Sequence, residues 1–191
     1  IALQKGRPDA AEPCARLSQA VFRRSGDRVA WVRAQQTIGL CARQRGDFGR
    51  AAARYGAGLE ALASTPADLV TRARIYHDQG VALVLRAWAG NGDYSLPHRL
   101  LRWAEEHLRE ADPPLAWMTT IRRGELMTKL GRLARAESLL APFEDSTLQD
   151  QLKLPYRALF LRINAERHLG SGDWDAARPS FASALEIATV E

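Results

Sequence analysis

The chain of 191 residues is predicted to be all-α, a right-handed superhelical array of antiparallel helix hairpins with about nine helices. The main observation is a glycine followed by an alanine-rich amphipathic segment, which recurs at separations of 40, 46, 39 and 41 residues. The five copies begin at Gly6, Gly46, Gly92, Gly131 and Gly172. A period in this range is typical of stacked helical hairpins. No segment shows the period-2 alternation of a strand.

The first and last copies agree closely. The segment from Gly6 to Cys14 aligns with the segment from Gly172 to Ser180, and both carry Asp-Ala-Ala at the same offset. We therefore predict one continuous solenoid over 1–191, because a repeat array grows by adding units. Its divisions are a half repeat over 1–27 and repeats over 28–66, 67–114, 115–153 and 154–191. The chain opens and closes on second helices of hairpins, so we expect a piece of a longer protein.

The helices of the first half follow from apolar stripes at helical spacing and from the breaks between them. An opening helix over 10–24 carries an alanine and leucine stripe that ends at Ser25 and Gly26. The next hairpin runs from Arg28 to Ala63, with its break at 45–47. A polar connection over 64–68 contains Pro66, and proline cannot continue a helix interior.

The third hairpin is the irregular one. Its first helix covers 69–88 and its second starts near Pro97, so the interval of 46 residues localises an insertion to the loop over 89–93. The last two hairpins are more regular. They pair 115–130 with 133–143 and 155–169 with 175–189, separated by a connection over 145–153.

Each hairpin repeats one scheme of turn, cap and packing. Glycine adopts positive φ at no steric cost and so permits the tight turn. The aspartates after three of these glycines are expected to cap the second helices, namely Asp47, Asp93 and Asp173. Small residues five positions after the glycine then let two helices approach, at Ala51, Ala136 and Ala177. One turn further, large residues fill the space between hairpins, at Tyr55, Leu140 and Phe181.

At these residues the chain resembles the tetratricopeptide repeat (TPR) family. The family pattern of glycine, alanine and aromatic is met at Gly46, Ala51 and Tyr55 and again at Gly172, Ala177 and Phe181. The small first-helix residue of the family is matched by Gly39, Gly124 and Ala165. The period of roughly 42 departs from the 34 residues of the family. Longer repeats of this type resemble those in the sensor regions of large bacterial transcription activators.

Composition and charge narrow the function. Hydrophobic residues make up 46% and charged residues 26%, as in a protein that buries a core. The net charge is +5, but it comes almost entirely from arginines at many helix phases, without a basic block. We therefore expect no direct contact with nucleic acid, which needs a concentrated basic patch. No apolar run is long enough to cross a membrane and no export signal is visible, so we expect a cytoplasmic protein.

Catalytic and metal chemistry have no support in the residue pattern. No nucleophile constellation is present, and Gly90 to Gly92 is too short for a phosphate loop. Cys14 and Cys41 are expected to be reduced, buried apolar residues, and the four histidines show no ligand spacing with them. We predict no enzyme activity, no cofactor and no metal site.

The family resemblance implies a groove lined by the exposed face of each first helix. For this chain that face would offer Arg33, Gln36, Arg43, Arg74, His77, Glu125, Arg162 and Glu166. As a set they describe a groove that is basic in its first half and mixed in its second. The lysine and asparagine pattern of chaperone-tail clamps is missing, because Gln36 and Leu40 stand in its place.

The leading hypothesis is a non-enzymatic scaffold that binds another protein or a peptide. The alternative is an effector-sensing or oligomerisation domain of a bacterial transcriptional regulator, whose partner would be a small effector. Self-association through exposed ends of the array is a further alternative, because an unpaired opening helix exposes an apolar face.

Overall fold

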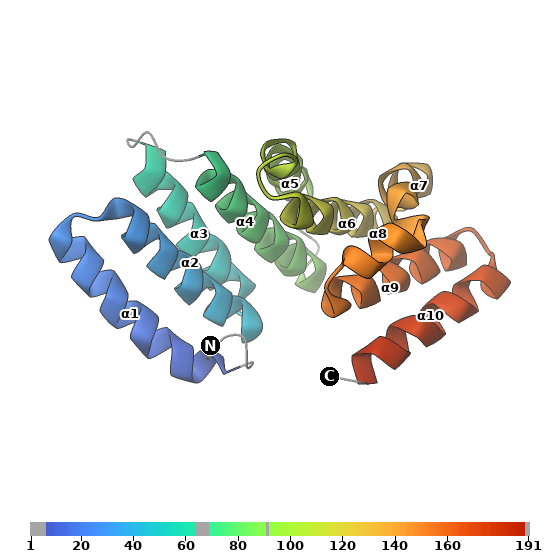
Figure 1. The fold of residues 1–191 in the computed structure, drawn as a ribbon, viewed down its shortest axis with the longest axis horizontal. Coiled ribbons are helices and arrows are strands. Elements are labelled where there is room, and N and C mark those ends of the chain that lie inside the picture. Colours follow the sequence, from blue (N-terminus) through green and yellow to red (C-terminus); the bar gives the residue numbers. More distant parts are fainter. Residues whose placement is uncertain (1–6, 64–68, 91, 190–191) are drawn as a thin grey trace. The chain divides into compact units, whose positions relative to one another are not determined.

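The computed structural model describes residues 7–63, 69–90 and 92–189, and every regular element within these ranges is a helix (Figure 1). The all-α prediction is confirmed. Gly6, the predicted connection over 64–68 and Asn91 of the predicted loop lie outside the described residues.

The chain divides into two compact units, residues 1–112 and 113–191, each treated separately below. The first contains α1 (Pro8–Ser25), α2 (Arg28–Gln44), α3 (Phe48–Ala63), α4 (Leu69–Ala89) and α5 (Ser95–Leu108). The second contains α6 (Pro113–Lys129), α7 (Leu133–Leu140), a 3-10 turn η1 (Ala141–Glu144), α8 (Ser146–Gln151), α9 (Leu154–Gly170) and α10 (Trp174–Thr189). The repeat boundaries within one solenoid stay a prediction.

The helices differ from the predicted ones in two places. The predicted helix over 133–143 is α-helical only as far as Leu140 and finishes as the 3-10 turn η1. The predicted connection over 145–153 contains a short extra helix, α8, which Asp145 caps by accepting a hydrogen bond from the Thr147 amide at 2.8 Å. The local signal for α8 is this aspartate, because an acidic side chain at the N-cap satisfies free amides of the first turn.

The hairpin turns are built as predicted at three of the glycines. Gly46, Gly131 and Gly172 have φ values of 79°, 68° and 82°. The residue after Gly46 donates its amide to the Ala42 carbonyl at 3.0 Å, and the same bond follows Gly172, to the His168 carbonyl at 2.9 Å. Two of the caps also agree: Asp47 and Asp173 each accept an amide of the following helix at 3.0 Å. Asp93 lies one position before the N-cap of α5, Tyr94, and accepts the amide of Ser95 at 2.7 Å. The turn of the α2–α3 hairpin is thus reproduced bond by bond in α9–α10.

Gly92 packs closely against the end of α4. Its amide donates to the Ala87 carbonyl at 3.2 Å, and a Cβ at this position would meet the Ala87 Cα at 3.0 Å. The inserted loop therefore needs glycine here for close approach to α4.

Close contact between the two helices of a hairpin depends on small first-helix residues. A Cβ added to Gly39 would lie 2.6 Å from Tyr55 Cε1, and one added to Gly124 would lie 2.6 Å from Leu140 Cδ2. Gly80 has the same relation to Leu101, at 2.8 Å. The prediction included Gly39 and Gly124 but missed Gly80, because the insertion displaces it from the expected distance before Gly92.

Each unit has its own apolar core. In the first, Tyr55 and Leu62 of α3 pack with Ile75 and Ala82 of α4. In the second, Leu140 packs with residues of α6 and α9 and with Phe143 of η1. The Phe143 and Phe160 rings lie 6.0 Å apart between centroids.

The two cysteines differ from expectation in one case. Both are free, and Cys41 is buried as predicted, but Cys14 is exposed. Cys14 lies on α1 at the border of an open recess. The expectation failed because, within the described residues, nothing covers this part of α1.

We expect Gly39→Ala to lower the free energy of unfolding by about 1–2 kcal/mol, because the new methyl group would overlap the buried Tyr55 ring. Gly49→Ala is the matched control in the same hairpin, since its Cβ would meet only Asp47 Oδ1 at 4.0 Å. The control should be neutral or stabilised by up to ~1 kcal/mol through helix propensity. Urea unfolding monitored by circular dichroism measures both; equal stabilities would show that the close approach does not matter.

Candidate functional site

The predicted groove residues lie on α2 and α4 in the first unit and on α6 and α9 in the second. In both units these are the first helices of hairpins, as the prediction requires. The contacts of the side chains are more specific than the sequence pattern indicated, and they form one cluster in each unit.

In the first unit, Gln36 and Arg43 of α2 meet at Asp78 of α4. Gln36 Nε2 donates to Asp78 Oδ2 at 2.7 Å, and Arg43 Nη1 lies 3.6 Å from Asp78 Oδ1. Burial raises the pKa of Asp78, and Arg43 and then Gln36 act against that rise. Asp78 was not among the predicted residues. It is the partner that joins two of them, and its only sequence signal is its place beside His77.

The other predicted residues of this unit have separate surroundings. Arg74 donates two hydrogen bonds to one oxygen of Asp112. Its Nε lies 3.2 Å and its Nη2 2.9 Å from Asp112 Oδ2. The expected exposure is wrong for His77, which is buried because it lies on the same side of α4 as Val81 and Val84. Arg33 is exposed and borders a recess.

That recess has a volume of about 490 Å³ and lies between α1 and α2. Its walls are small side chains, with Phe22 at one end and Arg33 and Thr37 as polar groups. It is an open depression in the surface, with the thiol of Cys14 at its edge.

In the second unit, α6 and α9 share a network of charged side chains around Glu125. Glu125 is fully buried, so the expected exposure is wrong here also. Its Oε2 accepts a hydrogen bond from Arg122 at 2.7 Å, and its Oε1 accepts another from Arg162. Arg162 also donates to Glu166 at 2.8 Å, and Lys129 lies 3.0 Å from the other oxygen of Glu166.

This network brings together all three predicted residues of the second unit and adds Arg122 and Lys129. Both additions could have been found, because they lie three positions before and four after Glu125 on one helix face. A buried carboxylate needs such cations, since its desolvation is costly without them.

A second recess, of about 510 Å³, lies beside this network. Arg122 and Arg162 form its charged side, and α10 forms an apolar side with Phe181 and Leu185. Leu159 of α9 is a further apolar residue of its lining. The combination can hold an apolar side chain and a carboxylate of one ligand at the same time.

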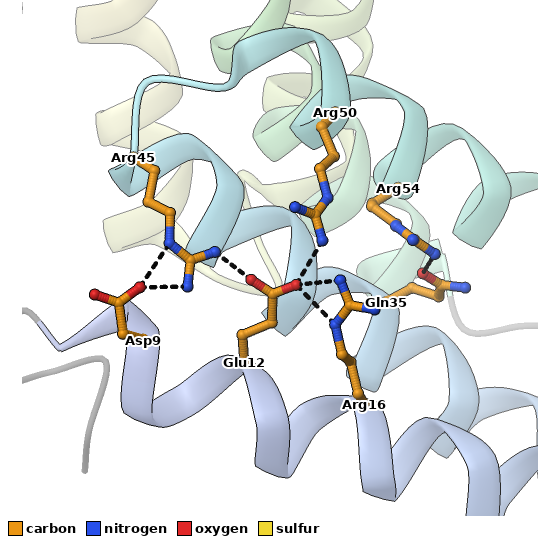
Figure 2. Close-up of polar contacts among 7 residues, drawn as sticks. All are labelled: Asp9, Glu12, Arg16, Gln35, Arg45, Arg50 and Arg54. Atoms are coloured by element: carbon orange, nitrogen blue, oxygen red, sulfur yellow. Dashed lines mark hydrogen bonds and ion pairs between the residues drawn. The ribbon is translucent and has the colours of Figure 1, made fainter.

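Another carboxyl group with a shifted pKa lies outside the predicted site, on α1 (Figure 2). Glu12 is buried and contacts Arg16 on its own helix, Arg45 after α2 and Arg50 on α3. Arg45, followed by Arg16 and Arg50, lowers the pKa of Glu12 to about 2 against the opposing effect of burial. Figure 2 shows these three guanidinium groups converging on one carboxylate, with Asp9 on the far side of Arg45. The cluster ties α1 to the α2–α3 hairpin.

Metal sites and membrane spans are two other features that the fold could carry. In the described parts of the chain, no three His, Cys, Asp or Glu side chains are grouped so that they could hold a metal ion. Within those same ranges, no helix combines the length and the apolar character that crossing a membrane requires.

Comparisons with known proteins show the fold. No protein-family model matches the chain, and no curated protein does either. A similar solved structure is a crystal structure from Podosopora anserina, described as a kinesin light chain with nearly identical TPR-like repeats. The TM-score is 0.70 at 14% sequence identity, and the match covers 97% of this chain and 89% of that one. The chain therefore has a TPR-like α-solenoid fold, which is typical of protein-interaction scaffolds.

We expect Glu12→Gln to lower the free energy of unfolding by about 2 kcal/mol, between the effect of an exposed pair and that of a fully buried one. The three arginines would lose their shared carboxylate, although each is partly in contact with water. The control is Glu106→Gln, which removes an exposed pair with Arg102 on α5 and should change stability by less than ~0.5 kcal/mol. Thermal and urea unfolding measure the stability of both variants. Equal losses of stability would refute the role of Glu12 as the carboxylate that joins α1 to the α2–α3 hairpin.

The same carboxylate predicts a pH dependence. The folded-state pKa of about 2 lies below the usual value of 4.5, so the contribution of Glu12 is complete above pH 4.5 and is lost as the pH falls toward 2. The stability gap between the native chain and Glu12→Gln should therefore narrow across this window. Urea unfolding at pH 7, 4.5 and 3 measures this difference in the free energy of unfolding. A difference that stays constant over these pH values would contradict the lowered pKa of Glu12.

Proposed function

We propose that the chain is a non-enzymatic scaffold that binds another protein or a peptide with its first helices. The observation that carries this proposal is the charged network of the second unit, where three cationic and two acidic side chains lie beside an apolar recess. The excess of positive charge favours an acidic partner. The TPR-like fold supports the same class of function.

The predicted groove residues of the first unit form a separate set within this proposal. Arg33 and Arg74 are exposed, and Arg43 is half-buried with Gln36 at Asp78. His77 and Glu125 are buried, and their part in binding would be to hold neighbouring side chains in place. We propose no contact with nucleic acid and a cytoplasmic location.

A second candidate is an effector-sensing or oligomerisation domain of a bacterial transcriptional regulator. The recess between α1 and α2 favours it, because about 490 Å³ is within the range of small-molecule sites. Arg33 would then meet an anionic group of the effector, and Phe22 would meet an apolar one.

We expect a phage-displayed library of random peptides, selected on the immobilised chain, to yield acidic peptides whose affinity falls as salt is added. Lys129→Gln should weaken the selected peptide by roughly fivefold, because it removes a cation from the edge of the network. Arg102→Gln, an exposed arginine on α5, should leave it unchanged. Fluorescence polarisation measures the three affinities.

Other outcomes decide between the candidates. If no peptide is enriched while an anionic metabolite raises the melting temperature, and Arg33→Gln removes that rise, the effector-sensing candidate is favoured. If neither a peptide nor a metabolite binds, both proposals are wrong.

A further inference from the structure

The net positive charge of the chain is carried by its first unit. Residues 1–112 contain 17 lysine and arginine residues against 12 acidic residues, whereas residues 113–191 contain ten of each. The whole excess of +5 therefore belongs to the first unit. The place where these positive side chains gather on the surface decides what the unit attracts.

Four of the arginines lie together where α1 meets the α2–α3 hairpin (Figure 2). They are Arg16 on α1, Arg45 in the turn after α2, and Arg50 and Arg54 on α3, and we call them the arginine surface. The first three contact Glu12. Among the described residues Arg54 contacts no carboxylate, and its Nη1 donates to Gln35 Oε1 at 3.4 Å.

This cluster buries its negative charge and exposes its positive charges. The side chain of Glu12 has an exposed fraction of 8%, while that of Arg16 has one of 53% and those of Arg45 and Arg50 are about one third exposed. Arginines so close together repel one another, and the buried carboxylate offsets that repulsion and fixes the directions of their side chains. The side that faces water is thus cationic and already ordered.

Packing between hairpins does not require the arginines to be on the outside, because the second unit makes the corresponding contact with the charges reversed. Glu137 of α7 stands at the same position of the repeat as Glu12, six residues after the glycine. There the buried side chain is Arg167 of α9, with an exposed fraction of 10%, and its partners Glu137 and Glu144 are exposed. The outward arginines are thus a property of the first unit and not of the hairpin contact.

Carboxylate groups suit the arginine surface as ligands. A guanidinium group presents parallel N–H donors that match the two oxygens of a carboxylate, and side chains that are already held in place lose less conformational freedom on binding. The exposed carboxylate of Asp9 lies beside Arg45 and would repel the evenly spaced charges of a nucleic-acid backbone. A peptide avoids this repulsion, because its acidic side chains are separate and flexible.

We propose that the arginine surface of the first unit binds an acidic segment of a protein partner, with carboxylates at Arg16, Arg50 and Arg54. The inference rests on the proposed protein-binding function and assigns to the acidic partner a second contact, distinct from the network around Glu125. All the side chains involved come from α1, the α2–α3 turn and α3.

The probe is a rhodamine-labelled peptide of six glutamates, and a labelled peptide of six glutamines is its neutral control. Fluorescence polarisation with the full chain at about 50 mM salt should show saturable binding of the acidic peptide, with Kd on the order of 10–500 μM, and no binding of the neutral one. Raising the salt to about 300 mM should weaken binding several-fold, because exposed charges are screened.

Two double variants with an equal loss of charge test the location. Arg50→Gln with Arg54→Gln should weaken the acidic peptide at least fivefold, because both changes remove guanidinium groups from the arginine surface. Arg86→Gln with Arg102→Gln is the matched control, since both arginines are exposed and lie on α4 and α5 of the same unit. The control should change the affinity less than about twofold. Equal weakening by the two double variants would mean that the peptide responds only to net charge, and the inference would be wrong.

Two single variants keep the test independent of folding. Arg54→Gln removes no contact with a carboxylate, so circular dichroism and thermal unfolding should stay native while the peptide binds roughly twofold to threefold more weakly. Asp9→Asn removes the exposed acid at the edge and should strengthen binding by about twofold. Unchanged affinity in both variants would overturn the assignment of the surface.

Other outcomes identify a different occupant. If a single-stranded DNA oligonucleotide of equal charge binds more tightly than the acidic peptide and loses its affinity in the Arg50 and Arg54 double variant, the ligand is nucleic acid and the inference is wrong. If sedimentation shows a dimer of the chain that the same double variant abolishes, without peptide binding, the occupant is a second copy and the inference is wrong.

The remaining outcomes separate this inference from the broader proposal. If library-selected acidic peptides bind and respond to Lys129→Gln, while the six-glutamate peptide does not respond to the arginine variants, the inference fails and the proposed function stands. Absence of all binding overturns both.

Discussion

The close approach of the two helices within a hairpin is the constraint on which the other features depend. Gly39 and Gly124 have no side chain where Tyr55 and Leu140 insert, so a large residue of the second helix reaches the backbone of the first. The large side chain is buried in that contact and also presents a surface to the next hairpin. Loss of the small residue would therefore disturb both the pairing within a hairpin and the stacking between hairpins.

Charged residues between helices are arranged around this apolar framework. Glu12 and Glu125 are both buried carboxylates, and each receives guanidinium groups from a neighbouring helix. Removing such a carboxylate from water is costly, and the arginines offset the cost without adding much net stability. Their contribution is to specify which helices meet and at which register, which an apolar alanine-rich surface specifies poorly.

The parts of the fold that depend on neighbours in sequence could be predicted. The turn glycines and the aspartate caps need only three or four adjacent residues, and they are present at Gly46 and Asp47 as expected. The predictions that failed concern contacts between residues that are far apart in the sequence. Cys14 was expected to be buried because its helix is amphipathic, but burial depends on what lies against that face. The only local signal for Asp78 was its place beside His77, since its role depends on Gln36, 42 positions away. The proposed groove residues lie on first helices of hairpins, but which of them would be exposed depends on packing that sequence spacing alone does not determine.

The bond-by-bond likeness of the α2–α3 and α9–α10 turns also bears on how the chain avoids misfolding. Two nearly interchangeable hairpins give a folding chain two surfaces on which α4 could dock, and repeat proteins are prone to errors of this kind. The buried acids distinguish the alternatives, because Arg162 of α9 reaches Glu125 only when α6 and α9 are paired. With the wrong neighbour, the buried Glu125 would keep only the cation of its own helix, Arg122. The ion pairs thus disfavour incorrect pairings of helices in an array whose apolar surfaces are nearly alike.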